Sequence, residues 1–250
     1  MIPTGRLLVI CLSFSVLTTK LVSENIQLGL RLPEGFEVFE YANHEYANDI
    51  YTMTTDPKGQ ITVAGRRYIR MLVDRDKNGQ ADQAIQFPNG PLDGAMGLFW
   101  ENNTPFFTGD SGLHCYRNEN GHLHADGPAK QLADMKTGGE HSAQAIRRGP
   151  DGWLYVLCGN MTGIDDSFAS DPHSPITRPV AGCVVRFSPD FTKKEIVADG
   201  FRNAYDMDFN LNGDLFIYDS DNERCAGLPW YELTRIVVNR ITASLHDIRT

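Results

Sequence analysis

The sequence has little that would suit a nucleic-acid-binding, zinc-finger or nucleotide-binding protein. Its 250 residues carry a formal net charge of −9 and contain no basic run to neutralise phosphates, which argues against a nucleic-acid partner. No CxxC pair occurs, so a zinc site or a c-type haem attachment is not expected. A Walker A loop, a GxSxG elbow and an HExxH motif are also missing. These absences leave small molecules, cations and proteins as the candidate partners.

Long apolar runs are missing too, with one short exception near the N-terminus. The run from Leu7 to Leu17, preceded by Arg6, is shorter than the about 20 residues that a membrane-spanning helix needs. A basic residue followed by such a run is typical of a secretory signal, which we assign to residues 1–23. The alternative is an N-terminal helix or strand that packs on the domain. The signal predicts an exported protein, located in the periplasm, on the cell surface or outside the cell.

Cysteines are few, with five in the whole chain. Cleavage after the predicted signal would remove Cys11 and leave Cys115, Cys158, Cys183 and Cys225. In an exported protein these four could form two disulfides, in one of three connectivities. Isolated buried thiols are the alternative that we favour.

Helical periodicity is nearly absent, whereas short strand-like runs separated by turn residues recur. Three segments share a turn that ends in glycine and a following apolar or aromatic run: DPKGQITVAG (56–65), GPDGWLYVLCGN (149–160) and NLNGDLFIYDSD (210–221). The segment ENNTPFFTGD (101–110) is a weaker copy, with Asn103 at the glycine position. Another strand-like stretch precedes each turn, which predicts a β-hairpin in every copy.

The spacing of these copies predicts the fold. They begin roughly 45–60 residues apart, close to the period of propeller blades. We therefore expect an all-β protein, and the long period favours a β-propeller over a sandwich. Four copies account for about four blades, and one further strand fits after Tyr231. Because this is an incomplete set, we expect a truncated chain: a partial propeller at residues 24–236 and an aberrant tail at 237–250.

Polar residues stand at matching positions ahead of the hairpins. Eleven residues before the last turn residue lie Asn48 in the first copy, His141 in the third and Arg202 in the fourth. The same count in the weaker copy reaches Leu92, which Asp93 follows. The innermost strand of a propeller blade lines the central channel, so these positions should lie at the channel mouth. The residues expected to form this polar ring are Asn48, Asp49, Asp93, His141, Arg202 and Asn203.

His141 and Arg202 are the members of the ring that suit catalysis. A neutral imidazole can accept a proton near physiological pH, as a general base does. A guanidinium can bind a carboxylate or stabilise a developing oxyanion, and Asn203 could donate to the same ligand. Structural roles stay open: a loop hydrogen bond for His141, an ion pair for Arg202 and a turn for Asn203.

The stretch DRDKNGQAD (74–82) resembles a calcium loop. Asp74, Asp76, Asn78 and Asp82 stand at positions 1, 3, 5 and 9 of such a loop, and Gly79 permits its sharp turn. The glutamate expected at position 12 is missing, and the flanking runs read as strands. We therefore expect an inter-strand loop that binds calcium, and the alternative is a hairpin turn rich in Asx residues.

Four segments carry a resemblance to a known family. GEHSAQAIRRGPDGWLYVLCGN and GFRNAYDMDFNLNGDLFIYDSDNER resemble the glucose/sorbosone dehydrogenase family. LPEGFEVFEYA and LVDRDKNGQADQAIQF look like its planctomycete branch of membrane-bound dehydrogenase domain proteins. The resemblance covers roughly residues 28–236 and implies a six-bladed propeller that binds pyrroloquinoline quinone (PQQ) and calcium and oxidises sugars.

The resemblance also implies roles for individual residues. His141, ahead of GPDG, would remove the hydroxyl proton of the substrate. Arg202, in the GxRN segment, would contact the quinone oxygens, with Asn203 beside it. Sugar-oxidising members carry GDxG after the second strand, whereas this chain has GNMTG (159–163), so an acid that orients His141 is not evident. Asp165 or Asp166 could substitute.

Three functions remain open from the sequence. The first is a PQQ-dependent dehydrogenase acting on a sugar or an alcohol, active or inactive as a fragment, with an electron acceptor that the sequence does not name. The second is a calcium-dependent, lactonase-like hydrolase, which Asp49 and Asp93 would suit better than His141 and Arg202. The third is a non-catalytic extracellular propeller that binds a carbohydrate or a protein.

Overall fold

The computed structural model describes residues 7–9, 24–25, 28–222 and 230–237. Most of the predicted signal segment 1–23 and of the tail 237–250 lies outside the described residues, as do Cys11 and Cys225. Within the described part the regular structure is β-strand, apart from one turn of 3-10 helix at Asp166–Phe168. None of the helical structure described there is long and apolar enough to cross a membrane.

Four antiparallel sheets follow one another along the chain, and we call them blades one to four. Blade one comprises β5 (Ile50–Thr55), β6 (Ile61–Gly65), β7 (Tyr68–Val73) and β8 (Gln83–Gln86). Blade two comprises β9 (Gly97–Glu101), β10 (Thr104–Gly109), β11 (Gly112–Cys115) and β12 (Lys130–Asp134). Blade three comprises β13 (Ala143–Arg148), β14 (Leu154–Cys158), β15 (Gly182–Phe187) and β16 (Lys194–Phe201). Blade four comprises β17 (Ala204–Phe209), β18 (Leu215–Asn222) and β19 (Trp230–Ile236).

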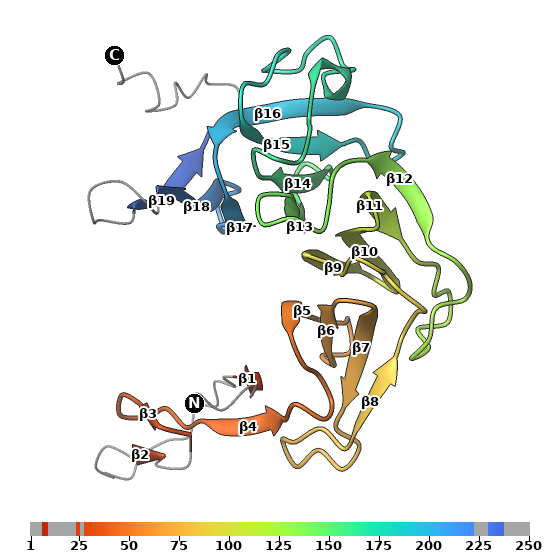
Figure 1. Ribbon diagram of the computed structural model, residues 1–250, viewed down its shortest axis with the longest axis vertical. Helices are drawn as coiled ribbons and strands as arrows, with labels where there is room; N and C mark the ends of the chain where they lie inside the picture. Colours follow the sequence, from red (N-terminus) through yellow and green to blue (C-terminus); the bar gives the residue numbers. More distant parts are fainter. Residues whose placement is uncertain (1–6, 10–23, 26–27, 223–229, 238–250) are drawn as a thin grey trace.

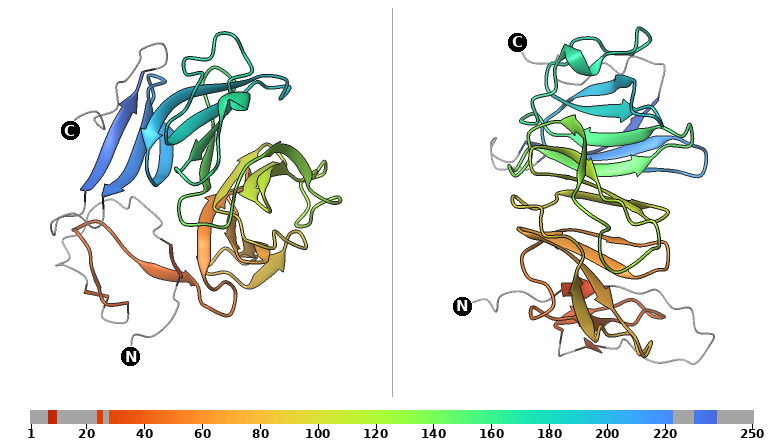
Figure 2. Two further views of the ribbon diagram at one scale, coloured as in Figure 1. Left: turned by 45° about the horizontal axis from the view of Figure 1, so that its top comes forward. Right: turned by 90° about the vertical axis from the view of Figure 1, so that its right-hand side faces the viewer.

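The blades are arranged as part of a propeller, which confirms the predicted all-β fold and the set of about four blades. In Figure 1 the first strands of the blades, β5, β9, β13 and β17, face a common centre, and the later strands lie further out. The right-hand view of Figure 2 shows the sheets stacked one after another. Two smaller pairs accompany blade one: β1 (Leu7–Val9) with β4 (Phe39–Ala42), and β2 (Glu24–Asn25) with β3 (Leu30–Arg31).

Each gap between neighbouring blades is filled by its own apolar cluster. Ile69 and Met71 of blade one pack with Leu98 and Phe107 of blade two, and similar clusters join blades two to three and three to four. The middle strands of blades one to three are therefore largely covered on both faces, whereas β18 of blade four exposes Tyr218. Every residue of β6 and β14 is buried, which explains why these strands read as continuous apolar runs rather than alternating ones.

The glycine-ended turns have the same conformation in three blades. Gly59, Gly152 and Gly213 have φ angles of 81°, 79° and 81°, a region that favours glycine. Each of their N–H groups donates to the carbonyl three residues earlier. Blade two differs, because β9 and β10 are joined by a two-residue turn in which Asn102, not Asn103, has positive φ. The count of eleven residues is therefore not transferable to that blade.

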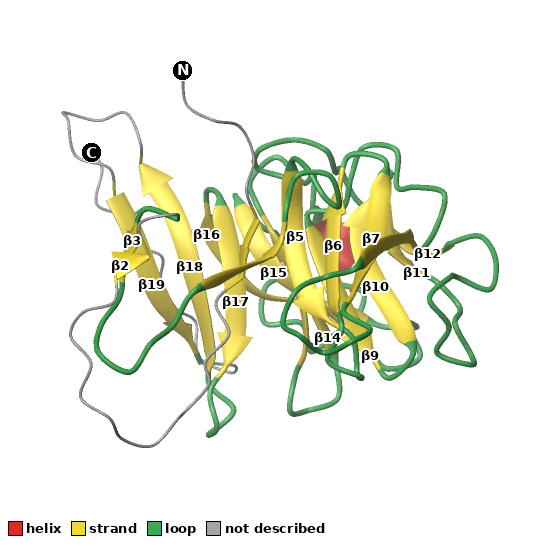
Figure 3. Ribbon diagram, turned by 90° about the horizontal axis from the view of Figure 1, so that it is seen from below, coloured by secondary structure: helices red, strands yellow, loops and turns green. Residues whose placement is uncertain are grey.

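The alternation of strand direction gives the propeller two rims (Figure 3). The first strand of every blade starts at one rim, which we call the mouth rim. The glycine-ended turns close the hairpins at the other, which we call the far rim. The loop 74–82 joins β7 to β8 and belongs to the far rim, because β7 runs in the same direction as β5.

Candidate functional site

His141 lies at the mouth rim, two residues before β13, and its ring is held by an amide. Nδ1 of the half-buried imidazole lies 2.8 Å from Oδ1 of Asn160. An imidazole that donates from Nδ1 to an amide oxygen keeps Nε2 as its acceptor. The arrangement therefore presents a proton acceptor while the amide fixes the orientation of the ring.

Asn160 also joins His141 to Arg202 of the next blade. Its backbone N–H donates to the Arg202 carbonyl at 2.8 Å. The N–H of Met161 donates to the His141 carbonyl at 3.0 Å, so the turn after β14 is bonded to both rim residues. Gly159 makes this approach possible, because a Cβ there would lie 2.5 Å from the His141 carbonyl oxygen. The rim residues of blades three and four are thus held together by one short turn.

A buried carboxylate positions Arg202 and Asn203. Asp219 of β18 is 5% exposed, and its two oxygens accept the N–H groups of Arg202 and Asn203 at 3.0 and 2.9 Å. Nη1 of Arg202 donates to the Ser220 carbonyl at 2.9 Å. The mouth of the β17–β18 hairpin is therefore fixed by charge-assisted hydrogen bonds.

Gln144 of β13 makes a second connection between these blades. Its side chain is buried, and Nε2 donates to Oδ1 of Asn203 at 2.8 Å and to the Glu140 carbonyl at 3.3 Å. It thereby joins the residue beside His141 to the residue beside Arg202. The Asn203 amide is used in this contact, which fixes its orientation at the rim.

Asp93 lies at the same rim, but not at the position equivalent to His141. Asn48, His141 and Arg202 each lie seven residues before the last residue of their strand, whereas that position in β9 is Gly94. The Asp93 carboxylate accepts from the Thr137 hydroxyl and from the backbone N–H of Asp110. Asp93 thus fixes the loop that leads to His141.

Asn48 and Asp49 are exposed where blade one reaches the mouth rim. The Asn48 carbonyl accepts from the Tyr68 hydroxyl at 2.6 Å. Burial raises the pKa of Tyr68 above its ordinary value, so this hydroxyl remains a donor in neutral solution. Asp49 adopts a φ of 55°, which short polar residues tolerate.

An axial groove runs along the inner strands of the four blades. Its lining includes Tyr51 of β5, Leu98 of β9, Gln144 of β13 and Tyr205 of β17. Arg147, also in the lining, pairs with Asp206 across the blades at 3.1 Å. A concave surface with a few fixed polar groups is the usual setting of a small-molecule site.

The predicted cation loop gathers its carboxylates at the far rim. Oxygens of Asp74, Asp76 and Asp82 lie within 4.8 Å of one another. They accept backbone N–H groups of the loop, for example Gly79 to Asp74 at 2.9 Å and Arg75 to Asp82 at 2.7 Å. The side-chain amide of Asn78 donates to Asp76. Because the loop lies at the far rim, it is separated from His141 and Arg202 by the length of the blade.

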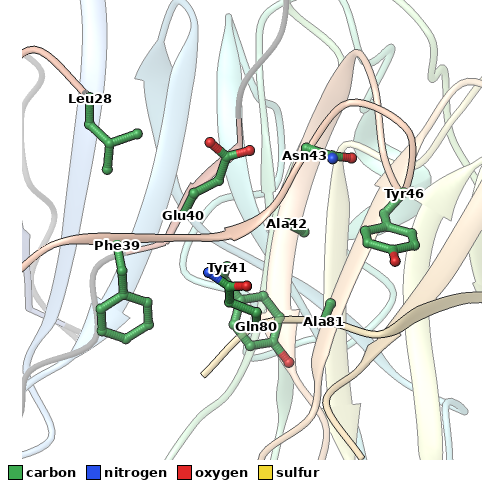
Figure 4. Close-up of a pocket in the computed structure, with 9 residues that line it drawn as sticks. All are labelled: Leu28, Phe39, Glu40, Tyr41, Ala42, Asn43, Tyr46, Gln80 and Ala81. Carbon is green, nitrogen blue, oxygen red and sulfur yellow. The ribbon is translucent and has the colours of Figure 1, made fainter. Parts of the chain in front are cut away.

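A second pocket lies outside blade one and shares none of the rim residues (Figure 4). It is open between β4 and the end of the cation loop, and its lining is Leu28, Phe39, Glu40, Tyr41, Ala42, Asn43, Tyr46, Gln80 and Ala81. Tyr46 of the lining also connects this pocket to the cation loop, because its hydroxyl donates to the Asp82 carbonyl at 3.0 Å.

Three residues of the site were not expected from the sequence: Asn160, Gln144 and Asp219. Asp165 does not orient His141, because its carboxylate accepts from Ser167 at the start of the 3-10 helix. For Asn160 a signal existed, since it occupies the aspartate position of the GDxG motif. No local pattern marks Gln144 or Asp219, whose partners come from separate strands.

The comparisons with known proteins agree with this fold. A family model described as "Domain of unknown function (DUF7133)" matches residues 25–244. No curated protein matches the chain. The PQQ-bound aldose sugar dehydrogenase (Adh) of Streptomyces coelicolor is similar in structure, with 18% identity and a TM-score of 0.55 over 78% of this chain and 61% of that one.

Two further solved structures are similar at lower identity. The holo PQQ domain of pyranose dehydrogenase from Coprinopsis cinerea is 11% identical, with a TM-score of 0.54 over 74% of this chain and 47% of that one. A luciferin-regenerating enzyme is 11% identical, with a TM-score of 0.50 over 81% and 68% of the two chains. The chain thus spans less than two thirds of the two dehydrogenases, and at these identities the likeness concerns the fold.

Proposed function

The chain belongs to the DUF7133 family, and we propose that it is a propeller of the PQQ-dependent sugar or alcohol dehydrogenase type. One observation carries this proposal: His141 and Arg202, from different blades, are both bonded to Asn160 at the mouth rim. The dehydrogenases with which the chain shares its fold are PQQ-bound, which supports the same cofactor class here. A relationship to the glucose/sorbosone dehydrogenases is part of the proposal.

Among the rim residues, Arg202 fits an anionic quinone in its charge and chemistry. Arg202 offers a permanent positive charge, and its backbone is fixed by Asp219, so little ordering is needed when a carboxylate binds. Asn203, Asn48, Asp49 and Asp93 complete the proposed cofactor-binding set around the mouth. When bound, PQQ would supply the acceptor for the hydride of the substrate.

His141 is the proposed general base. Its Nδ1 faces Asn160, so Nε2 would take the hydroxyl proton of the sugar or alcohol. Asn160 keeps the ring in one orientation, as a positioning residue. A neutral partner gives less stabilisation to the imidazolium than a carboxylate would, which distinguishes this site from a His–Asp pair.

We also propose that the loop 74–82 binds calcium through Asp74, Asp76, Asn78 and Asp82. Three carboxylates within 4.8 Å repel one another, and a hard cation would relieve this repulsion. Because the loop lies at the far rim, the ion would stabilise blade one rather than contact the quinone. Calcium should raise the melting temperature, and Asp76→Asn should remove the effect, whereas Glu119→Gln, an exposed acid in blade two, should not.

Export remains part of the proposal, on the N-terminal segment 1–23. Determination of the N-terminal residue of protein recovered from the culture medium or periplasm tests it. Protein found only in the cytoplasm with an uncleaved N-terminus would contradict export.

PQQ titration followed by visible absorbance tests the main proposal. The chain is refolded with calcium, and Arg202→Ala is compared with Arg117→Ala, which removes a largely exposed arginine in blade two. We expect binding to be lost only in Arg202→Ala. His141→Ala should keep binding but lose dye reduction with a panel of aldoses.

The other functions predict different outcomes in the same experiment. Hydrolysis of lactones without quinone would support the lactonase-like alternative. Binding of a carbohydrate or protein with no quinone binding and no turnover would support a non-catalytic propeller. PQQ binding that persists in Arg202→Ala would contradict the placement of the cofactor at this rim.

A further inference from the structure

Two cysteines of blade three face each other across neighbouring strands. Cys158 is the last residue of β14, and Cys183, the second residue of β15, is its partner in the antiparallel ladder. Both side chains are completely buried in the same apolar cluster, so they point to the same face of the sheet. They are thiols in this structure.

The geometry of this pair suits a covalent bond. Directly opposed residues of antiparallel strands have Cα atoms about 4.5–5.5 Å apart, which lies within the range that disulfides span. The Cys158 thiol donates to the Val156 carbonyl of its own strand at 3.8 Å and is also the main cause of the raised pKa of Cys183, as expected of neighbouring sulfurs. Formation of the bond therefore needs little movement of the backbone.

The position of the pair gives the bond a consequence. The segment between the two strands, residues 159–181, begins with the turn that holds Asn160 against His141 and Arg202. A crosslink at its base would fix the point from which this turn leaves the sheet. Gly182, next to Cys183, already brings the strands close, because a Cβ there would lie 2.7 Å from the Cys158 carbonyl oxygen.

We propose that Cys158 and Cys183 form a disulfide that closes the base of the 159–181 segment. The two thiols lose two protons and two electrons, and a small disulfide such as oxidised glutathione accepts them and leaves as two thiols. The exchange takes place during folding, before the sheet covers the sulfurs. In the folded sheet two effects raise the pKa of Cys183: the interaction with the Cys158 thiol, which is the larger, and burial. The raised pKa slows attack by this thiol.

Peptide mapping after oxidative refolding tests the proposal. The full chain is refolded from denaturant with mixed reduced and oxidised glutathione, alkylated under denaturing conditions and digested without reduction. We expect one crosslinked peptide pair that contains Cys158 and Cys183, with a mass 2 Da below that of the two reduced peptides. Relative to reduced protein, the melting temperature should rise by roughly 5–10 °C for a closed segment of this length.

Single variants provide the control. Cys158→Ser and Cys183→Ser should each abolish the crosslinked pair and the rise in melting temperature, whereas Cys115→Ser, in blade two, should keep both. If a serine variant does not fold, the map of the wild-type chain decides alone. Alkylated Cys158 and Cys183 in the oxidatively refolded wild type, or crosslinks of either to another cysteine, would overturn the proposal.

Discussion

Replacement of Asp219 by alanine should loosen the Arg202–Asn203 segment more than any other part of blade four. The carboxylate is 5% exposed and accepts two backbone N–H groups, at 3.0 and 2.9 Å. Hydrogen bonds to a charged group contribute about 1.5–3 kcal/mol each. Arg202 and Asn203 are half-buried, so water can replace part of the loss. We therefore expect a cost of about 2–4 kcal/mol for Asp219→Ala.

Two measurements report this loss. Urea unfolding should give the decrease in global stability, which corresponds to a fall in melting temperature of roughly 5–15 °C for a chain of this size. Hydrogen exchange of the amides of Arg202 and Asn203 should be at least about tenfold faster, because 1.4 kcal/mol is a factor of ten. Asp219→Asn should have an intermediate effect, since its amide retains one acceptor oxygen.

The matched control is Asp208→Ala, in β17 of the same blade. The side chain of Asp208 is 80% exposed and does not bond to the rim residues. Exchange at Arg202 and Asn203 should be unchanged in this variant. If exchange at these two amides is no faster in Asp219→Ala than in the wild type, Asp219 does not hold the mouth of the hairpin and the reasoning fails.

Two further predictions test other contacts. Glu195→Ala should cost about 1.5–3 kcal/mol in urea unfolding, since Arg186 loses its buried partner 2.7 Å away and keeps Asp151 at 2.9 Å, whereas Glu119→Ala should cost less than about 1 kcal/mol. The Lys193 ammonium, with the backbone N–H of His173, holds the pKa of Asp171 well below its ordinary value. The stability that Asp171 contributes is therefore present above the unfolded pKa near 4 and is lost as the pH falls below it, so the melting temperature of Asp171→Asn should decrease less steeply on acidification than that of the wild type; parallel curves would refute this.

The hairpins could be predicted because their signals are local. Gly59, Gly152 and Gly213 each end a turn that needs positive φ, and the apolar runs after Gly59 and Gly152 are strands buried on both faces. The prediction was less accurate in blade two. There the two-residue turn shifts the count of eleven residues from the turn to the rim and places Asp93 beside the ring position rather than at it. Turn length thus limited how far one blade could be aligned with another.

The sequence by itself determined the all-β fold, the blade period and the approach of His141 and Arg202 to one rim, because strand period and turn chemistry act within a few residues. Only the tertiary structure decided their partners. Gln144 meets Asn203 from 59 positions away, and Asn160 reaches both His141 and the Arg202 carbonyl. The same holds for Cys158 and Cys183, which the ladder of β14 and β15 places face to face. Strand register and the packing of one blade on the next set these contacts, and both depend on residues from several segments of the chain.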